Sequence, residues 1–144
     1  MKLSIIIPVY NEEKTIRLLL KRVKNLPREK EIIIVDDGST DGTKKILEEE
    51  RRHSQTITKV IFQEKNRGKG AAIRRGIQEV TGEVVVIQDA DLEYDPMDLI
   101  KLMEPIEKGQ AQVVYGSRVL GRNPKDESTA AVSTTICTGR LRWR

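Results

Sequence analysis

Residues 32–42 read Ile-Ile-Ile-Val-Asp-Asp-Gly-Ser-Thr-Asp-Gly. The apolar run at its start does not alternate with polar residues, which is typical of a strand buried on both faces of a parallel sheet. The run then changes into acidic and small polar residues, which favour turns and helix starts. The stretch therefore predicts a buried strand whose carboxyl end carries polar side chains.

Four further apolar runs of this kind occur, and helical segments separate them. The five predicted strands are Ser4–Val9, Glu31–Val35, Ile57–Phe62, Glu83–Gln88 and Gln112–Tyr115. Strands that alternate with helices are the pattern of an open, right-handed α/β sheet. We therefore expect an α/β fold with a Rossmann-like, mostly parallel sheet and helices on both faces.

Four helices are predicted between these strands from apolar spacing and from capping residues. The first follows Asn11 as a candidate N-cap and ends before Pro27. The second follows Asp41, and the third runs from about Lys69 to Val80. The fourth opens at Asp95 and Pro96 and contains Pro105, which should kink it or shorten its last turn.

Length and composition exclude several classes of protein. The chain has 144 residues and a formal net charge of +4, and most of that excess lies after residue 121. A single cysteine excludes an internal disulfide, and the apolar runs are far too short to cross a bilayer. We expect a cytoplasmic protein, soluble or peripheral at the cytoplasmic face of a membrane, that does not bind nucleic acid.

Polar clusters follow all five predicted strands. Because the carboxyl ends of parallel strands meet at one edge of a sheet, where α/β proteins bind ligands, we expect a site there. The clusters are Pro8-Val9-Tyr10-Asn11-Glu12, Asp36-Asp37-Gly38-Ser39, Asn66-Arg67-Gly68-Lys69-Gly70, Asp89-Ala90-Asp91 with Glu93, and Gly116-Ser117-Arg118.

The Asp89-Ala90-Asp91 cluster suits a hard divalent cation, since two carboxylates beside a diphosphate are a common Mg²⁺ environment. The alternative is that one aspartate caps a turn while the other is solvated. Asp37 has two roles open as well, contact with a nucleotide or local turn chemistry. Arg118 offers a planar fork for phosphate oxygens.

Other nucleotide-binding classes lack their signatures in this chain. No G-x-G-x-x-G follows the first strand and no G-x-x-x-x-G-K-[ST] occurs, which argues against a dinucleotide oxidoreductase and a P-loop ATPase. A nucleotidyltransferase would need a glycine-rich, basic signature after the first strand, where Pro8-Val9-Tyr10-Asn11-Glu12 stands.

In order and spacing, the five clusters resemble those of the inverting family 2 glycosyltransferases of the GT-A fold. The resemblance is greatest to the dolichyl- or polyprenyl-phosphate hexosyltransferases, such as the dolichol-phosphate mannose synthases. It covers residues 3–121 and implies a nucleotide-sugar donor, Mg²⁺ or Mn²⁺ as cofactor, and a lipid-phosphate or glycan acceptor. Inversion would follow from in-line attack on the anomeric carbon.

The resemblance also implies a role for each matching residue. Around the nucleotide it places Pro8, Tyr10, Glu12 and Asp37, with Lys69 and Asp89 also in contact with the donor. Asp89, Asp91 and Glu93 would hold the metal. Asp91 and Arg118 would be catalytic, because the metal and the guanidinium stabilise the charge of the departing diphosphate.

Residues 122–144 do not match the continuation that these enzymes have. We expect a nucleotide-sugar-binding core over residues 1–121, a tail of little order over residues 122–144, and a chain that is truncated at its carboxyl end. Two functions follow: a hexosyltransferase, or a nucleotide-sugar-binding half-domain without transfer activity.

Overall fold

A computed structural model describes residues 1–53, 58–117 and 132–138. Each of the five predicted strands and four predicted helices is found in it, and a sixth strand is added. The elements in chain order are β1 (Leu3–Val9), α1 (Ile16–Lys24), β2 (Lys30–Asp36), α2 (Thr43–His53), β3 (Thr58–Phe62), α3 (Lys69–Ile77), β4 (Val84–Ile87), α4 (Asp98–Glu107), β5 (Val113–Ser117) and β6 (Val132–Thr138).

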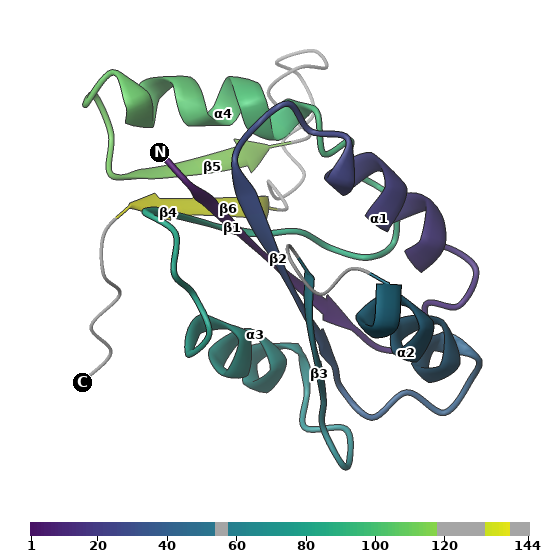
Figure 1. The fold of residues 1–144 in the computed structure, drawn as a ribbon. Coiled ribbons are helices and arrows are strands. Elements are labelled where there is room, and N and C mark those ends of the chain that lie inside the picture. Colours follow the sequence, from purple (N-terminus) through teal and green to yellow (C-terminus); the bar gives the residue numbers. More distant parts are fainter. Residues whose placement is uncertain (54–57, 118–131, 139–144) are drawn as a thin grey trace, which may run out of the picture.

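The strands form one sheet in the order β3-β2-β1-β4-β6-β5 (Figure 1). The first four in that order pair with one another in parallel. β6 is antiparallel to both β4 and β5, so β5 runs in the same direction as β4. The mostly parallel α/β fold is thus confirmed, and all five predicted strands end at the same edge.

Strand β6 corrects the expectation of little order after residue 121. Residues 132–138 pair with β4 on one side and with β5 on the other. The segment Val-Ser-Thr-Thr-Ile-Cys-Thr is rich in β-branched residues, which favour strands, although it has no clear hydrophobic period. Residues 118–131 and 139–144 lie outside the described part of the chain.

Helices cover both faces of the sheet and create two apolar clusters. On one face α1, α2 and α4 pack over alternate residues of β1, β2 and β4. On the other face α3 packs over Ile6, Ile33 and Val35 (Figure 1). A Cβ on Gly76 of α3 would lie 2.7 Å from Ile6, so the absence of a side chain lets this helix approach the sheet closely.

Two helix starts differ from the prediction. Thr15, rather than Asn11, precedes α1, because Asn11 has a φ of 53° and its side-chain carbonyl accepts the Thr40 N–H at 2.8 Å. Asn11 therefore joins the loops that follow β1 and β2. α4 begins at Asp98, after a turn in which the Asp95 carboxylate accepts the Met97 N–H and the Asp95 carbonyl accepts the Asp98 N–H.

Candidate functional site

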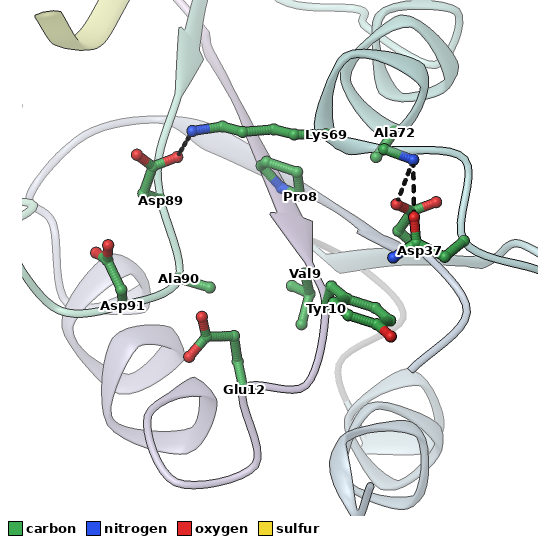
Figure 2. Close-up of a pocket in the computed structure, with 12 residues that line it drawn as sticks. Pro8, Val9, Tyr10, Glu12, Asp37, Lys69, Ala72, Asp89, Ala90 and Asp91 are labelled. Carbon is green, nitrogen blue, oxygen red and sulfur yellow. Dashed lines mark hydrogen bonds and ion pairs between the residues drawn. The ribbon is translucent and has the colours of Figure 1, made fainter. Parts of the chain in front are cut away.

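A cavity of about 300 Å³ opens at the carboxyl ends of the parallel strands (Figure 2). Three strand ends and the start of α3 contribute to it, as the polar clusters predicted. Its lining residues are Pro8, Val9, Tyr10, Glu12, Asp37, Asn66, Gly68, Lys69, Ala72, Asp89, Ala90 and Asp91. Seven predicted site residues are therefore brought together: Pro8, Tyr10, Glu12, Asp37, Lys69, Asp89 and Asp91.

Some residues that line the cavity were not among the individually predicted site residues. Asn66 and Gly68 stand in the recognised glycine-rich turn, and Val9 and Ala90 lie between predicted site residues. Ala72 is fully buried one turn after Lys69 in α3. Because Ala72 follows Lys69 by three residues, both lie on one face of the helix, and this spacing could have predicted Ala72 as a lining residue.

Asp37 is a buried carboxylate that organises the loop before α3. It is 3% exposed, and its oxygens accept the backbone N–H groups of Arg67 and Gly68, each at 2.8 Å. The side-chain amide of Gln63 donates a third bond at 3.2 Å. Both carboxylate oxygens are thus occupied by protein donors, so Asp37 shapes the wall of the cavity whether or not it also touches a ligand.

Gly38 lies close to the backbone of the same loop before α3. Its φ is +74°, and an added Cβ would lie 2.7 Å from the Asn66 nitrogen and from the Lys65 carbonyl carbon. We expect Gly38→Ala to lower the free energy of unfolding by about 2–4 kcal/mol, because a left-handed strain and a backbone clash act together. Urea unfolding measures this change.

Gly109→Ala is the matched control for the backbone strain. Gly109 has a φ of +67°, but nothing lies within 4 Å of an added Cβ. That variant should lose only about 1–2 kcal/mol, the cost of a left-handed residue with a side chain. Equal losses in the two variants would show that the contact between Gly38 and the loop contributes nothing.

The charged side chains of the cavity are mostly acidic. Glu12, Asp37, Asp89 and Asp91 line it together with one ammonium group, that of Lys69. Lys69 Nζ lies 2.5 Å from Asp89 Oδ1. An anionic ligand would therefore meet repulsion here unless a cation entered with it.

The two aspartates of the Asp89-Ala90-Asp91 cluster have different surroundings. Asp89 is paired with Lys69, whereas Asp91 is exposed and its Oδ1 accepts the Glu93 N–H at 3.1 Å. This bond closes a turn in which Leu92 has a φ of 62°. Asp91 thus forms the turn that the alternative to a metal site expected of one aspartate, while its side chain stays exposed. The metal-binding role of the two aspartates stays a prediction.

The chain was compared with models of protein families. The family model described as "Glycosyl transferase family 2" matches residues 4–141. The chain belongs to glycosyl transferase family 2. The match extends through β6 and so includes most of the segment that the sequence had set apart as a tail.

The names of two curated relatives of this family 2 chain contain a lipid phosphate. The undecaprenyl-phosphate 4-deoxy-4-formamido-L-arabinose transferase of Photorhabdus laumondii is 37% identical over 84% of this chain and 38% of its own length. The dolichol-phosphate mannosyltransferase of Pyrococcus furiosus is 39% identical over 82% of this chain and 33% of its own length. The chain therefore spans about a third of the length of each of these two relatives.

A solved structure with the same fold is a mannosyltransferase from Pyrobaculum calidifontis in complex with GDP-Man and Mn²⁺. It is 29% identical to this family 2 chain, the TM-score is 0.61, and the match covers 68% of this chain and 30% of the other. The GT-A fold expected from the sequence is confirmed.

The metal ligands predicted for this family 2 glycosyltransferase are only partly brought together. Asp89 and Asp91 line the cavity, but Glu93 does not. Within residues 1–53, 58–117 and 132–138, no group of three or more histidine, cysteine, aspartate or glutamate side chains is placed to hold a metal. The two aspartates still fit a divalent cation that completes its shell with water and ligand phosphates, as Mg²⁺ does.

Two further predictions concern the remaining site residue and the membrane. Arg118 lies outside the described residues, and its role stays a prediction. β5, which precedes it, ends at Ser117 on the edge that carries the cavity. In the described part of the chain, every helix is too short or too polar to pass through a bilayer.

Proposed function

We propose that this family 2 glycosyltransferase binds a nucleotide sugar together with Mg²⁺ or Mn²⁺ and transfers its hexose to a polyprenyl or dolichyl phosphate, with inversion. The observation that carries the proposal is the acidic cavity at the carboxyl edge, which Asp89, Asp91, Lys69 and Tyr10 line together and in which Lys69 reaches Asp89. The names of the lipid-phosphate relatives and the GDP-Man and Mn²⁺ complex of the related structure support it.

Three side chains of the cavity have separate roles toward the nucleotide in this proposal. Tyr10 is 45% exposed, so its ring has a free surface for the planar base of the nucleotide. Asp37 holds the loop 66–68 in place through backbone bonds, and this loop forms the wall beside the nucleotide. Glu12 accepts the Thr15 hydroxyl at 2.8 Å, which fixes its carboxylate near the ribose side.

The diphosphate would lie between Lys69 and the pair Asp89 and Asp91. A bound divalent cation supplies Lewis-acid stabilisation of the leaving diphosphate. The two aspartates would hold that cation, and Arg118 would contact the same phosphates. The acceptor phosphate is already an anion at neutral pH, so none of the cavity residues has to act as a strong base.

A thermal-shift panel of nucleotide sugars tests the proposal. With Mn²⁺ present, GDP-mannose, UDP-glucose or UDP-N-acetylglucosamine should raise the melting temperature by several degrees, because a ligand at a hundred times its Kd adds about 2.7 kcal/mol. A chelator should abolish the shift. If none of the three donors stabilises the protein with Mn²⁺, the proposal is wrong.

Transfer to a short-chain polyprenyl phosphate, followed with labelled sugar, separates the two functions left open by the sequence. Inverted product identifies a hexosyltransferase. Donor binding without product identifies a donor-binding unit, which is the second candidate because the chain spans about a third of its relatives' length. A lipid acceptor would place the reaction at the cytoplasmic face of a membrane.

A further inference from the structure

The Lys69 ammonium group bridges two walls of the cavity. Lys69 begins α3, whereas Asp89 follows β4, and the side chain reaches across the cavity above Pro8 to this carboxylate (Figure 2). Nζ and Oδ1 are 2.5 Å apart. Among the described residues that line the cavity, Lys69 alone is cationic.

This pair uses the carboxylate that a metal ion would also use. An ammonium group and a divalent cation repel each other at the distance of a shared carboxylate. While Lys69 stays at Oδ1, it neutralises part of the charge that Asp89 would offer to a metal and repels that metal. The two cations therefore compete for this carboxylate.

The exposure of the two side chains indicates which cation can leave. The Lys69 side chain is 57% exposed and that of Asp89 is 20% exposed. A flexible, half-exposed lysine contributes little to stability through such a pair, so its release has a small cost. Asp89 is held more firmly at the end of a buried strand.

We propose that Lys69 occupies the position of the cation on Asp89 in the ligand-free site, and that the diphosphate draws Lys69 away and opens Asp89 to the metal. The inference rests on the proposed function, because it needs a nucleotide diphosphate. Metal and nucleotide then bind interdependently: each raises the affinity for the other by the same factor.

Lys69→Met tests this inference through binding alone. The free Mn²⁺ signal in electron paramagnetic resonance gives the Mn²⁺ affinity with and without GDP or UDP. In the variant, Mn²⁺ should bind about fivefold more tightly without nucleotide, because the competing ammonium is gone. The factor by which nucleotide raises the Mn²⁺ affinity should fall by at least the same amount.

Two control variants separate the competition from a change in net charge. Lys65→Met removes an ammonium from the preceding loop, but Lys65 does not line the cavity, so both affinities should stay close to those of the unchanged protein. Lys69→Arg keeps a cation beside Asp89 and should retain most of the coupling.

The possible outcomes are distinct. Tighter Mn²⁺ binding and weaker coupling in Lys69→Met, but not in Lys65→Met, support the inference. Equal or weaker Mn²⁺ binding in Lys69→Met overturns it while the proposed function stands. If the unchanged protein binds no Mn²⁺ with either nucleotide, the proposed function is overturned and this inference with it.

Discussion

Replacing Asp91 by asparagine is expected to weaken Mn²⁺-dependent binding of the nucleotide sugar by about a hundredfold or more. Asp91 is the exposed carboxylate of the pair, whereas Asp89 is already engaged by Lys69. Without the charge of Asp91, the carboxylate of Asp89 is the single one left for the cation, and the Lys69 ammonium competes for it. The stabilisation by donor and Mn²⁺ in the thermal-shift assay should then vanish.

Asparagine is the informative replacement because it preserves the turn. Its side-chain oxygen can still accept the Glu93 N–H that Asp91 Oδ1 accepts, so the loop with the left-handed Leu92 can keep its shape. Alanine would remove the charge and the turn bond together. A loss in Asp91→Ala that is absent in Asp91→Asn would assign the effect to the loop rather than to metal binding.

Asp98→Ala serves as the control for this variant. Asp98 is an exposed carboxylate in the first turn of α4, outside the cavity. Its loss should leave the donor-induced shift and its sensitivity to chelator unchanged. An unaltered shift in Asp91→Asn would contradict the assignment of Asp91 as a metal ligand.

The second large effect concerns stability and lies at the opposite edge of the sheet. Glu31, near the start of β2, accepts the Ser4 hydroxyl at 2.5 Å and the backbone N–H of Thr81 at 2.6 Å. It also accepts the Thr81 hydroxyl, the Gly82 N–H and the Lys2 ammonium. This one carboxylate therefore ties β1, β2 and the segment before β4 together.

Glu31→Gln should lower the free energy of unfolding at neutral pH by about 3 kcal/mol. The amide keeps one acceptor oxygen, but its NH₂ group replaces the other. It then faces either the Ser4 hydroxyl and the Thr81 N–H, or the Thr81 hydroxyl and the Lys2 ammonium, which are all donors. Urea unfolding measures the loss. Glu29→Gln, an exposed position two residues earlier, should change stability by less than about 0.5 kcal/mol. Equal stability of Glu31→Gln and the unchanged protein would contradict the role of the carboxylate.

The same cluster predicts the pH dependence. Burial by itself raises the pKa of Glu31, but the hydrogen bonds from Ser4 and Thr81 and the charge of Lys2 outweigh it and lower the pKa from 4.5 to about 2. Because the folded state favours the ionised form, this stabilisation is complete above about pH 4.5 and is lost as the pH falls toward about 2. The difference in stability between the unchanged protein and Glu31→Gln should shrink over that range.

Much of the fold could be predicted because local sequence decides it. The apolar runs that became β1 to β5 lie within two residues of their predicted bounds, since runs rich in isoleucine and valine favour strands. The expected burial on both faces is wrong for β5, which lies at the edge of the sheet with Val113 43% and Tyr115 60% exposed. The position of β6 could not be predicted. Its place between β4 and β5 depends on pairing with strands distant in the chain, and no local period indicates that pairing.

For the site, the side chains that are available can be read from the chain, because each polar cluster directly follows an apolar run that ends at the same edge. How those side chains are used depends on the packing of the folded protein. It turned Asp37 toward the backbone of Arg67 and Gly68, and Asp89 toward Lys69, twenty residues away. The physical reason is that a carboxylate takes the donors that packing brings within reach, and packing across a sheet edge joins residues whose separation in the chain carries no signal.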